Sequence, residues 1–132
     1  MGRGAILAAT GAAVCALLLG CGGSDELAKA DFVQQANAIC KKDRAEASKK
    51  LASGPGEDIS LAIATVLDKE ANEIGALDGP SDEAGQIEAI LSGARKAAEA
   101  IEAKGDFTKA EAPLNEAEKL AADYGLNECL IS

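Results

Sequence analysis

Two stretches of the chain repeat their apolar residues with the alternating spacing of a heptad pattern, and this spacing constrains the fold more than any other feature. The gaps run 3, 4, 3, 4, 3 between residues 84 and 101, and they run the same way between 107 and 124. The first stretch contains Ala84, Ile87, Leu91, Ala94, Ala98 and Ile101, and the second contains Phe107, Ala110, Leu114, Ala117, Ala121 and Tyr124. A seam of this kind is buried only when another helix covers it. The pattern therefore predicts two amphipathic helices that pack against neighbours.

Two further amphipathic helices are predicted upstream. Apolar residues fall on one side of a helix over about 29–52, and on one stripe of a second helix over about 57–77. Three short segments separate the four helices: SGPG at 53–56, DGP at 78–80 and KGD at 104–106. Glycine and proline do not continue a helix cheaply, so each segment marks a break.

Single residues refine these boundaries. Ser81 suits the N-cap of the third helix, because its hydroxyl can accept a hydrogen bond from the first turn. Pro113 predicts a kink or a restart in the fourth helix. Gly125 suits the left-handed position just past the end of that helix.

The composition fits an all-helical fold. Aromatic residues make up 2% of the chain, alanine is abundant, and β-branched residues are sparse, which disfavours a sheet. Short alanine side chains let two helices approach closely. Four amphipathic helices joined by short loops predict an all-α, up-down-up-down four-helix bundle over residues 29–132. The loops at 53–56 and 104–106 then lie at one end of the bundle, and the loop at 78–80 lies at the other.

The amino terminus has the features of an export signal. One basic residue, Arg3, precedes an apolar stretch over 5–20. At about 1.5 Å per residue this stretch spans roughly 24 Å, which is short of the ~30 Å hydrocarbon core of a bilayer. The following LLGC, at 18–21, resembles the bacterial lipobox, Leu-x-(Gly/Ala)-Cys. The resemblance implies that the chain is cut between Gly20 and Cys21 and that a diacylglycerol is attached to the Cys21 thiol.

The lipobox predicts the organisation and location of the chain. We expect residues 1–20 to be a cleaved lipoprotein signal peptide, 21–28 to be the lipidated Cys21 with a short tether, and 29–132 to be the helical domain. The protein would be held at the extracytoplasmic face of the cell membrane through its lipid anchor. The alternatives are an ordinary secreted protein and an uncleaved signal anchor, with Cys21 as a bystander thiol.

The remaining cysteines predict a disulfide. Cys15 lies inside the predicted signal peptide and Cys21 carries the lipid, which leaves Cys40 and Cys129. Two leftover thiols in an exported protein usually pair. The bond would close a loop of nearly 90 residues, contributing about 4–5 kcal/mol in the chain-entropy model. A redox-active pair is the alternative, although no Cys-x-x-Cys motif is present.

Two stretches, ADFVQQANAIC at 30–40 and AADYGLNEC at 121–129, resemble a group of small exported lipoproteins from actinobacteria. Similar proteins carry a Phe-Val...Ala-x-Ala-Ile-Cys stretch near the mature start and a Tyr-Gly-Leu-x-x-Cys stretch near the end. Their Leu-x-x-Pro-Pro-like turn is replaced here by Gly79-Pro80. The resemblance implies a helical domain with a terminal disulfide. It carries over no catalytic residue, because no activity is established for the group.

Charge and composition disfavour several functions. The chain has a net charge of −9, and residues 21–132, with 12 basic and 22 acidic residues, carry −10. An acidic domain repels phosphate backbones, so we expect no nucleic-acid partner. The chain contains no histidine, the commonest metal ligand and general base. With no nucleophile elbow, phosphate loop or EF-hand spacing either, we expect no catalysis, no metal and no cofactor.

Three features remain open to a functional interpretation. Asp43 lies near the apolar stripe of the first helix, as a carboxylate that reaches water, a buried one paired with lysine or tyrosine, or a ligand contact. Tyr124 is expected to cap the core with its hydroxyl in water. The basic stretch at 40–50 is interpreted as a solvated face with pairs such as Glu46 with Lys50. Lipid headgroups or cell-wall polyanions are its alternative ligands.

The leading hypothesis is a lipid-anchored, extracytoplasmic helical module that binds a ligand or an envelope partner without catalysis. A short tether would hold the bundle close to the membrane, with the loops at 53–56 and 104–106 facing outward. A protein partner in the cell envelope is expected at that outward end. The alternative is a small-molecule capture lipoprotein with its ligand between helices, which requires a cavity of several hundred Å³.

Overall fold

The computed structural model describes residues 26–53, 58–104 and 107–129, and this part of the chain is helical without any strand. The elements are α1 (Lys29–Ser53), α2 (Ile59–Gly75), the 3₁₀ turn η1 (Ser81–Glu83), α3 (Ala84–Lys104), α4 (Phe107–Tyr124) and the 3₁₀ turn η2 (Asn127–Cys129). The predicted all-α fold is confirmed. No helix in the described part of the chain has the length and apolarity needed to cross a bilayer.

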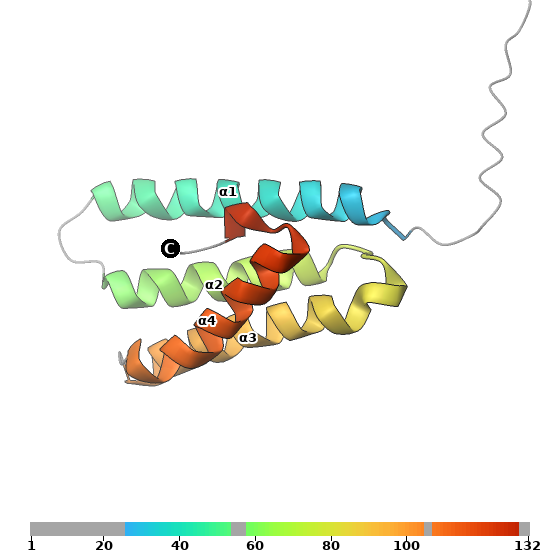
Figure 1. Cartoon of the computed structure of the whole chain (residues 1–132). Helices are drawn as coiled ribbons and strands as arrows, with labels where there is room; N and C mark the ends of the chain where they lie inside the picture. The colour runs from blue at the N-terminus through green and yellow to red at the C-terminus, as the bar shows by residue number, and fades with distance from the viewer. Residues whose placement is uncertain (1–25, 54–57, 105–106, 130–132) are drawn as a thin grey trace, which may run out of the picture.

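The helices follow one another up and down, as predicted (Figure 1). α2 packs between α1 and α3, and α4 packs on α3. α4 does not lie along α1, however: it crosses obliquely over α2 and α3, and α1 meets η2, the turn that follows α4 (Figure 1). We call the end that holds the start of α1, the end of α2 and η1 the near end. The opposite end, with the end of α1 and the starts of α2 and α4, is the far end.

The core divides into two clusters as a consequence of this crossing. The near-end cluster draws on all four helices and contains Phe32, Ala36, Cys40, Ala71, Ile74, Ile90, Leu91, Ala121, Tyr124 and Leu126. The far-end cluster contains Ala64, Leu67, Ala97, Ala98, Ile101 and Ala110. No α1 residue belongs to the far-end cluster among the described residues. The predicted seams of α3 and α4 are buried or half-buried apart from their first residues, Ala84 and Phe107, which are exposed.

An aromatic pair and a disulfide bind α1 to the end of α4. The rings of Phe32 and Tyr124 meet edge to face, with centroids 6.1 Å apart. The Cys40–Cys129 disulfide joins α1 to η2 with a Cα–Cα distance of 5.1 Å. The predicted pairing is therefore confirmed. Asn37 adds a polar bridge, because its amide donates to the Gly125 carbonyl at 3.0 Å and accepts from the Glu128 N–H at 2.9 Å.

The environment of Tyr124 differs from the prediction. Its hydroxyl donates to Glu83 at 2.6 Å instead of lying in water, and the Lys29 ammonium lies 4.2 Å from the ring centroid. Burial, followed by the hydrogen bond to Glu83, raises the pKa of the Tyr124 hydroxyl. The hydrogen bonds from Tyr124 and Lys29 lower the pKa of Glu83. The long-range approach of η1 to α4 creates this network, so local sequence spacing did not indicate it.

Helix boundaries follow local chemistry with one difference. Asp58 caps α2, because its carboxylate accepts from the Ser60 N–H at 2.9 Å. Ser81 does not cap α3: η1 follows Pro80 with no side-chain cap, and the Ser81 N–H instead donates to the Glu26 carboxylate. Pro113 lies inside a continuous α4, so the helix does not restart there. Gly125 has φ +101°, the left-handed conformation predicted for it.

The contact between α3 and α4 depends on a glycine, which gives a testable pair of substitutions. A Cβ built on Gly93 would lie 2.8 Å from Ala117 Cβ and 3.2 Å from the Pro113 carbonyl oxygen. Gly93→Ala should therefore lower the free energy of unfolding by about 1–3 kcal/mol. The matched control is Gly85→Ala in the same helix, where nothing lies within 4 Å. It should stabilise by about 0.5–1 kcal/mol in urea unfolding, and equal effects of the two changes would contradict the close contact.

Candidate functional site

The second half of α1 has fewer buried residues than the first half. Phe32, Ala36 and Cys40 are fully buried, whereas the only buried residue beyond Cys40 in α1 is Asp43. The reason lies in the crossing of α4, which covers the near end and leaves the far half of α1 facing α2 alone (Figure 1). The sequence matches this arrangement, since KKDRAEASKK at 41–50 is mostly charged. Charged groups therefore replace apolar packing along this half of the helix.

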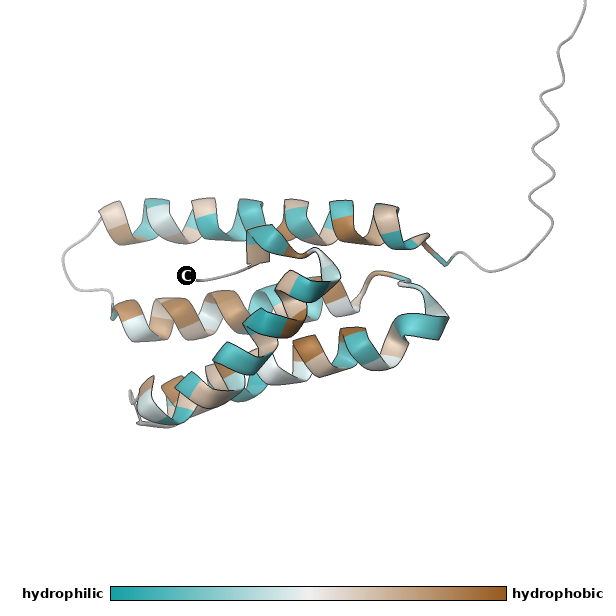
Figure 2. Cartoon of the chain, viewed as in Figure 1, coloured by the Kyte–Doolittle hydropathy of each residue, from teal (hydrophilic) through white to brown (hydrophobic). Residues whose placement is uncertain are grey.

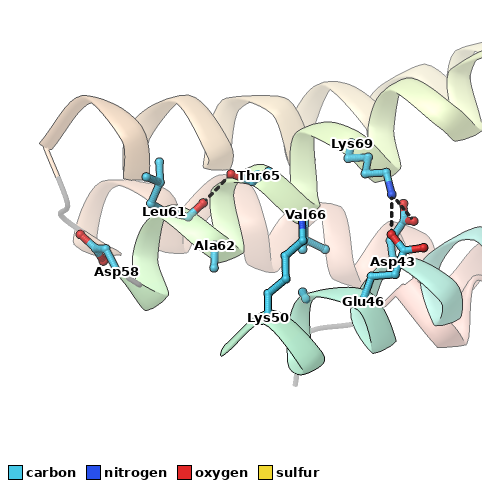
Figure 3. A pocket seen from close by; sticks show the side chains of 10 residues that line it. Asp43, Glu46, Lys50, Asp58, Leu61, Ala62, Thr65, Val66 and Lys69 are labelled. Carbon is cyan, nitrogen blue, oxygen red and sulfur yellow. Dashed lines mark hydrogen bonds and ion pairs between the residues drawn. The ribbon is translucent and has the colours of Figure 1, made fainter. Parts of the chain in front are cut away.

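A network of ion pairs joins α1 to α2, and Lys42 and Glu73 lie at its edge. We call its five central side chains the charge clasp: Asp43, Arg44, Glu46, Lys69 and Glu70. The Lys69 ammonium donates to Asp43 at 2.7 Å and to Glu46 at 3.2 Å (Figure 3). The hydrogen bond to Asp43, followed by that to Glu46, raises the pKa of Lys69. Lys69 in turn lowers the pKa of Glu46. The second oxygen of Asp43 is buried without a hydrogen-bond partner, so the clasp stabilises α1 less than apolar packing would.

The second ion pair of the clasp contains a carboxylate in an unfavourable environment. Arg44 Nε donates to Glu70 at 3.2 Å, and Glu70 is only 5% exposed. Burial raises the pKa of Glu70 to about 7, although the Arg44 charge and hydrogen bond oppose the shift. The nearby Asp43 carboxylate adds to the rise, and Lys69 opposes it. Glu70 therefore changes its charge near neutral pH at the junction between α1 and α2.

Glu70 predicts an unusual pH dependence of stability. The folded chain binds a proton at Glu70 with a pKa of about 7, against an ordinary value of 4.5. Protonation therefore favours the folded state, and stability should fall by about 2–3 kcal/mol as the pH rises from 5 to 8. The pKa values of Glu46 and Glu83 are lowered in the folded chain. Their contributions to stability are therefore lost only as the pH falls below this range. Urea unfolding at pH 5 and pH 8 measures the effect. A Glu70→Gln variant with the same pH slope as wild type would contradict it.

An open groove lies beside the clasp, between the end of α1 and the start of α2 (Figure 3). Its volume is about 400 Å³. Ala47 of α1 and Leu61, Ala62 and Val66 of α2 supply its apolar walls. Lys50 extends from α1 across the groove toward Val66 (Figure 3). The short side chains of Ala47 and Ala62 leave this space open between the two helices.

The far end also exposes apolar side chains. In the described part of the chain, the exposed large apolar residues are Ile59 at 63%, Leu61 at 54% and Phe107 at 43%. All three lie in the first turns of α2 and α4, at the far end, and Figure 2 shows the apolar start of α2. Phe107 begins the predicted seam of the fourth helix, and Ile59 belongs to the apolar stripe predicted over 57–77, so both were expected to be buried. They are exposed because the crossing of α4 leaves the beginnings of both helices without a covering neighbour.

The structure tests some of the predicted site residues, and others lie outside the part of the chain that it describes. The predicted cleavage and lipidation site, Gly20 and Cys21, lies outside the described residues. Asp43 is buried and paired with lysine, one of the three interpretations that the sequence left open. Glu46 pairs with Lys69 of α2 instead of Lys50. The described residues hold no group of three or more His, Cys, Asp or Glu side chains that could bind a metal.

The groove was not predicted from the sequence, because its width depends on where α4 lies. One signal was present: the apolar periodicity of the first helix weakens after Cys40, where charged residues take over. A helix that loses its apolar stripe halfway along has no apolar partner for that half.

The chain matches no protein-family model, and neither a curated protein nor a solved structure matches it. Its function is therefore inferred from its own residues and geometry.

Proposed function

We propose that this chain is a lipid-anchored binding module on the extracytoplasmic face of the cell membrane, without catalytic activity. Cys21 carries the anchor, and the far end meets a partner in the cell envelope. The lipobox-like sequence at 18–21 supports the anchor. The motifs at 30–40 and 121–129 support a place among the small exported lipoproteins of actinobacteria.

The start of the domain supports an orientation with the near end toward the membrane. The Leu27 N–H donates to the Asp78 carbonyl at 2.7 Å, and the Leu27 side chain packs on the near-end cluster. The neighbouring Glu26 carboxylate accepts from the Ser81 N–H. Only residues 22–25 then separate the lipidated cysteine from the part of the domain that the structure describes. At most ~3.6 Å per residue, they reach about 14 Å. The far end would point away from the bilayer.

The observation that carries the proposal is the contrast between the two ends. The near end is closed by the disulfide and the Phe32–Tyr124 pair. The far end contains the open groove and the exposed side chains of Ile59, Leu61 and Phe107. Exposed large apolar groups at one end of a domain favour a contact surface at that end.

Site-specific crosslinking in the native envelope tests this proposal. A photoreactive amino acid replaces Leu61 at the far end or, in the matched control, the exposed Asp31 at the near end. We expect the Leu61 probe to form a defined adduct with an envelope component, and Ile59→Glu to reduce that adduct. Adducts from Asp31 alone, or adducts from Leu61 that Ile59→Glu leaves unchanged, would contradict a far-end contact surface.

Capture of a small molecule is the second candidate function, and the groove favours it. A ligand site between helices requires a cavity of several hundred Å³, and the groove of about 400 Å³ meets that requirement. Both candidate functions therefore use the far end.

A further inference from the structure

We propose that the groove between α1 and α2 binds a single-chain amphiphile with an anionic head. The acyl chain would lie on Ala47, Ala62 and Val66, and the head would pair with Lys50. This inference rests on the proposed function, since it names the ligand class of the same far end.

The shape and walls of the groove favour an aliphatic chain. Its volume of about 400 Å³ lies within the range of small-molecule sites, ~300–1,000 Å³. Ala47, Leu61, Ala62 and Val66 give it aliphatic walls, and no aromatic side chain lines it. A ring-shaped ligand would therefore find no stacking partner there, whereas a narrow aliphatic chain removes these side chains from water.

Apart from Lys50 and one buried oxygen of Asp43, the polar side chains that line the groove have partners within the protein. Thr65 Oγ1 donates to the Leu61 carbonyl at 2.8 Å, and the Asp58 carboxylate caps α2. Asp43 and Glu46 share Lys69. A sugar or a peptide would bury many polar groups against these walls without partners, which costs free energy for each group. A ligand that is polar at one end only avoids that cost.

Lys50 indicates the charge of the polar end. In the part of the chain that the structure describes, no carboxylate lies within ion-pair distance of its ammonium. The other lysine of the groove, Lys69, is neutralised by Asp43 and Glu46. Figure 3 shows the Lys50 side chain crossing the groove toward Val66, so its methylene groups lie along the apolar walls. A carboxylate or phosphate head would complement that ammonium.

Photolabelling of the full chain tests the inference. The protein is reconstituted in phosphatidylcholine nanodiscs and irradiated with a diazirine-bearing fatty acid, and the labelled peptides are mapped by mass spectrometry. We expect the label within residues 41–53 and 58–69. Unlabelled fatty acid or lysophosphatidic acid should compete, which distinguishes a carboxylate head from a phosphate head. The uncharged methyl ester should compete poorly. Labelling elsewhere, or equal competition by the ester, would overturn the inference.

Three variants make the test specific to the groove. Lys50→Glu should reduce the labelling about fivefold at sub-saturating probe. Lys49→Glu is the matched control, because Lys49 is adjacent and exposed but does not line the groove, and it should label like wild type. Ala62→Leu should block the site by filling it. The urea midpoint of each variant shows whether it is folded.

Equal labelling of the two lysine variants, or full labelling of a folded Ala62→Leu, would overturn the site. If labelling fails while the Leu61 crosslinker still captures an envelope component, this inference is wrong and the proposed function stands. Loss of both signals would contradict both the ligand inferred for the groove and the contact surface proposed at the far end.

Discussion

Replacing Phe32 with alanine should lower the free energy of unfolding by about 3–5 kcal/mol, the largest effect expected of a single substitution in this chain. The Phe32 ring is fully buried in the near-end cluster and contacts Tyr124 edge to face. A Cβ built on Gly79 would lie 2.9 Å from the ring, so backbone also packs against it. Backbone cannot collapse into the space that the ring leaves, and a cavity remains.

Urea unfolding of the purified protein measures the loss. A domain of this size has a total stability of about 5–15 kcal/mol, so Phe32→Ala should be close to unfolding at 37 °C. The matched control is Val33→Ala, one residue along α1, where the side chain is only half-buried. It should cost about 1 kcal/mol. A loss below about 1 kcal/mol for Phe32→Ala would mean that the near-end cluster is not the centre of stability.

Removal of the disulfide should have an effect of similar size. The Cys40–Cys129 bond spans 89 residues of sequence, which corresponds to about 4–5 kcal/mol in the chain-entropy model. It also joins α1 to η2, in a fold where α1 does not lie along α4. We therefore expect the double variant Cys40→Ala/Cys129→Ala to lose about 3–5 kcal/mol and to loosen the contact between η2 and α1.

Two measurements separate the parts of this prediction. Urea unfolding gives the total loss. Amide hydrogen exchange shows where protection is lost: we expect faster exchange at Glu128, whose N–H donates to Asn37 across the same contact. Asn37→Ala with the disulfide intact is the control for the polar bridge and should cost about 1 kcal/mol. A double variant as stable as wild type would show that packing alone holds α1 to η2.

The parts of the fold that depend on local spacing or on covalent chemistry were predictable from the sequence. The heptad seams indicated α3 and α4, because apolar residues at helical spacing form the face of a helix that packs against its neighbours. Gly125 was predictable because the left-handed conformation favours glycine. The cysteine pair followed from elimination within a chain predicted to be exported, and the structure confirms the pairing.

The crossing of α4 was not predictable, because it depends on contacts between distant residues. Gly93 lets α4 approach α3 closely at Ala117. The pairs that follow, Tyr124 with Glu83 and Asp43 with Lys69, join residues 41 and 26 positions apart. No periodicity within one helix contains such information. The sequence therefore indicated the helices of the candidate site and the polarity of α1, but not the groove between them.

The intact mass of the protein isolated from bacterial membranes decides whether a lipid on Cys21 holds the module at the extracytoplasmic face. We expect a chain that begins at Cys21, lacks residues 1–20, and carries the mass of a diacylglycerol on its first residue. An unmodified Cys21, or a chain that retains the leader, would rule out the lipid anchor.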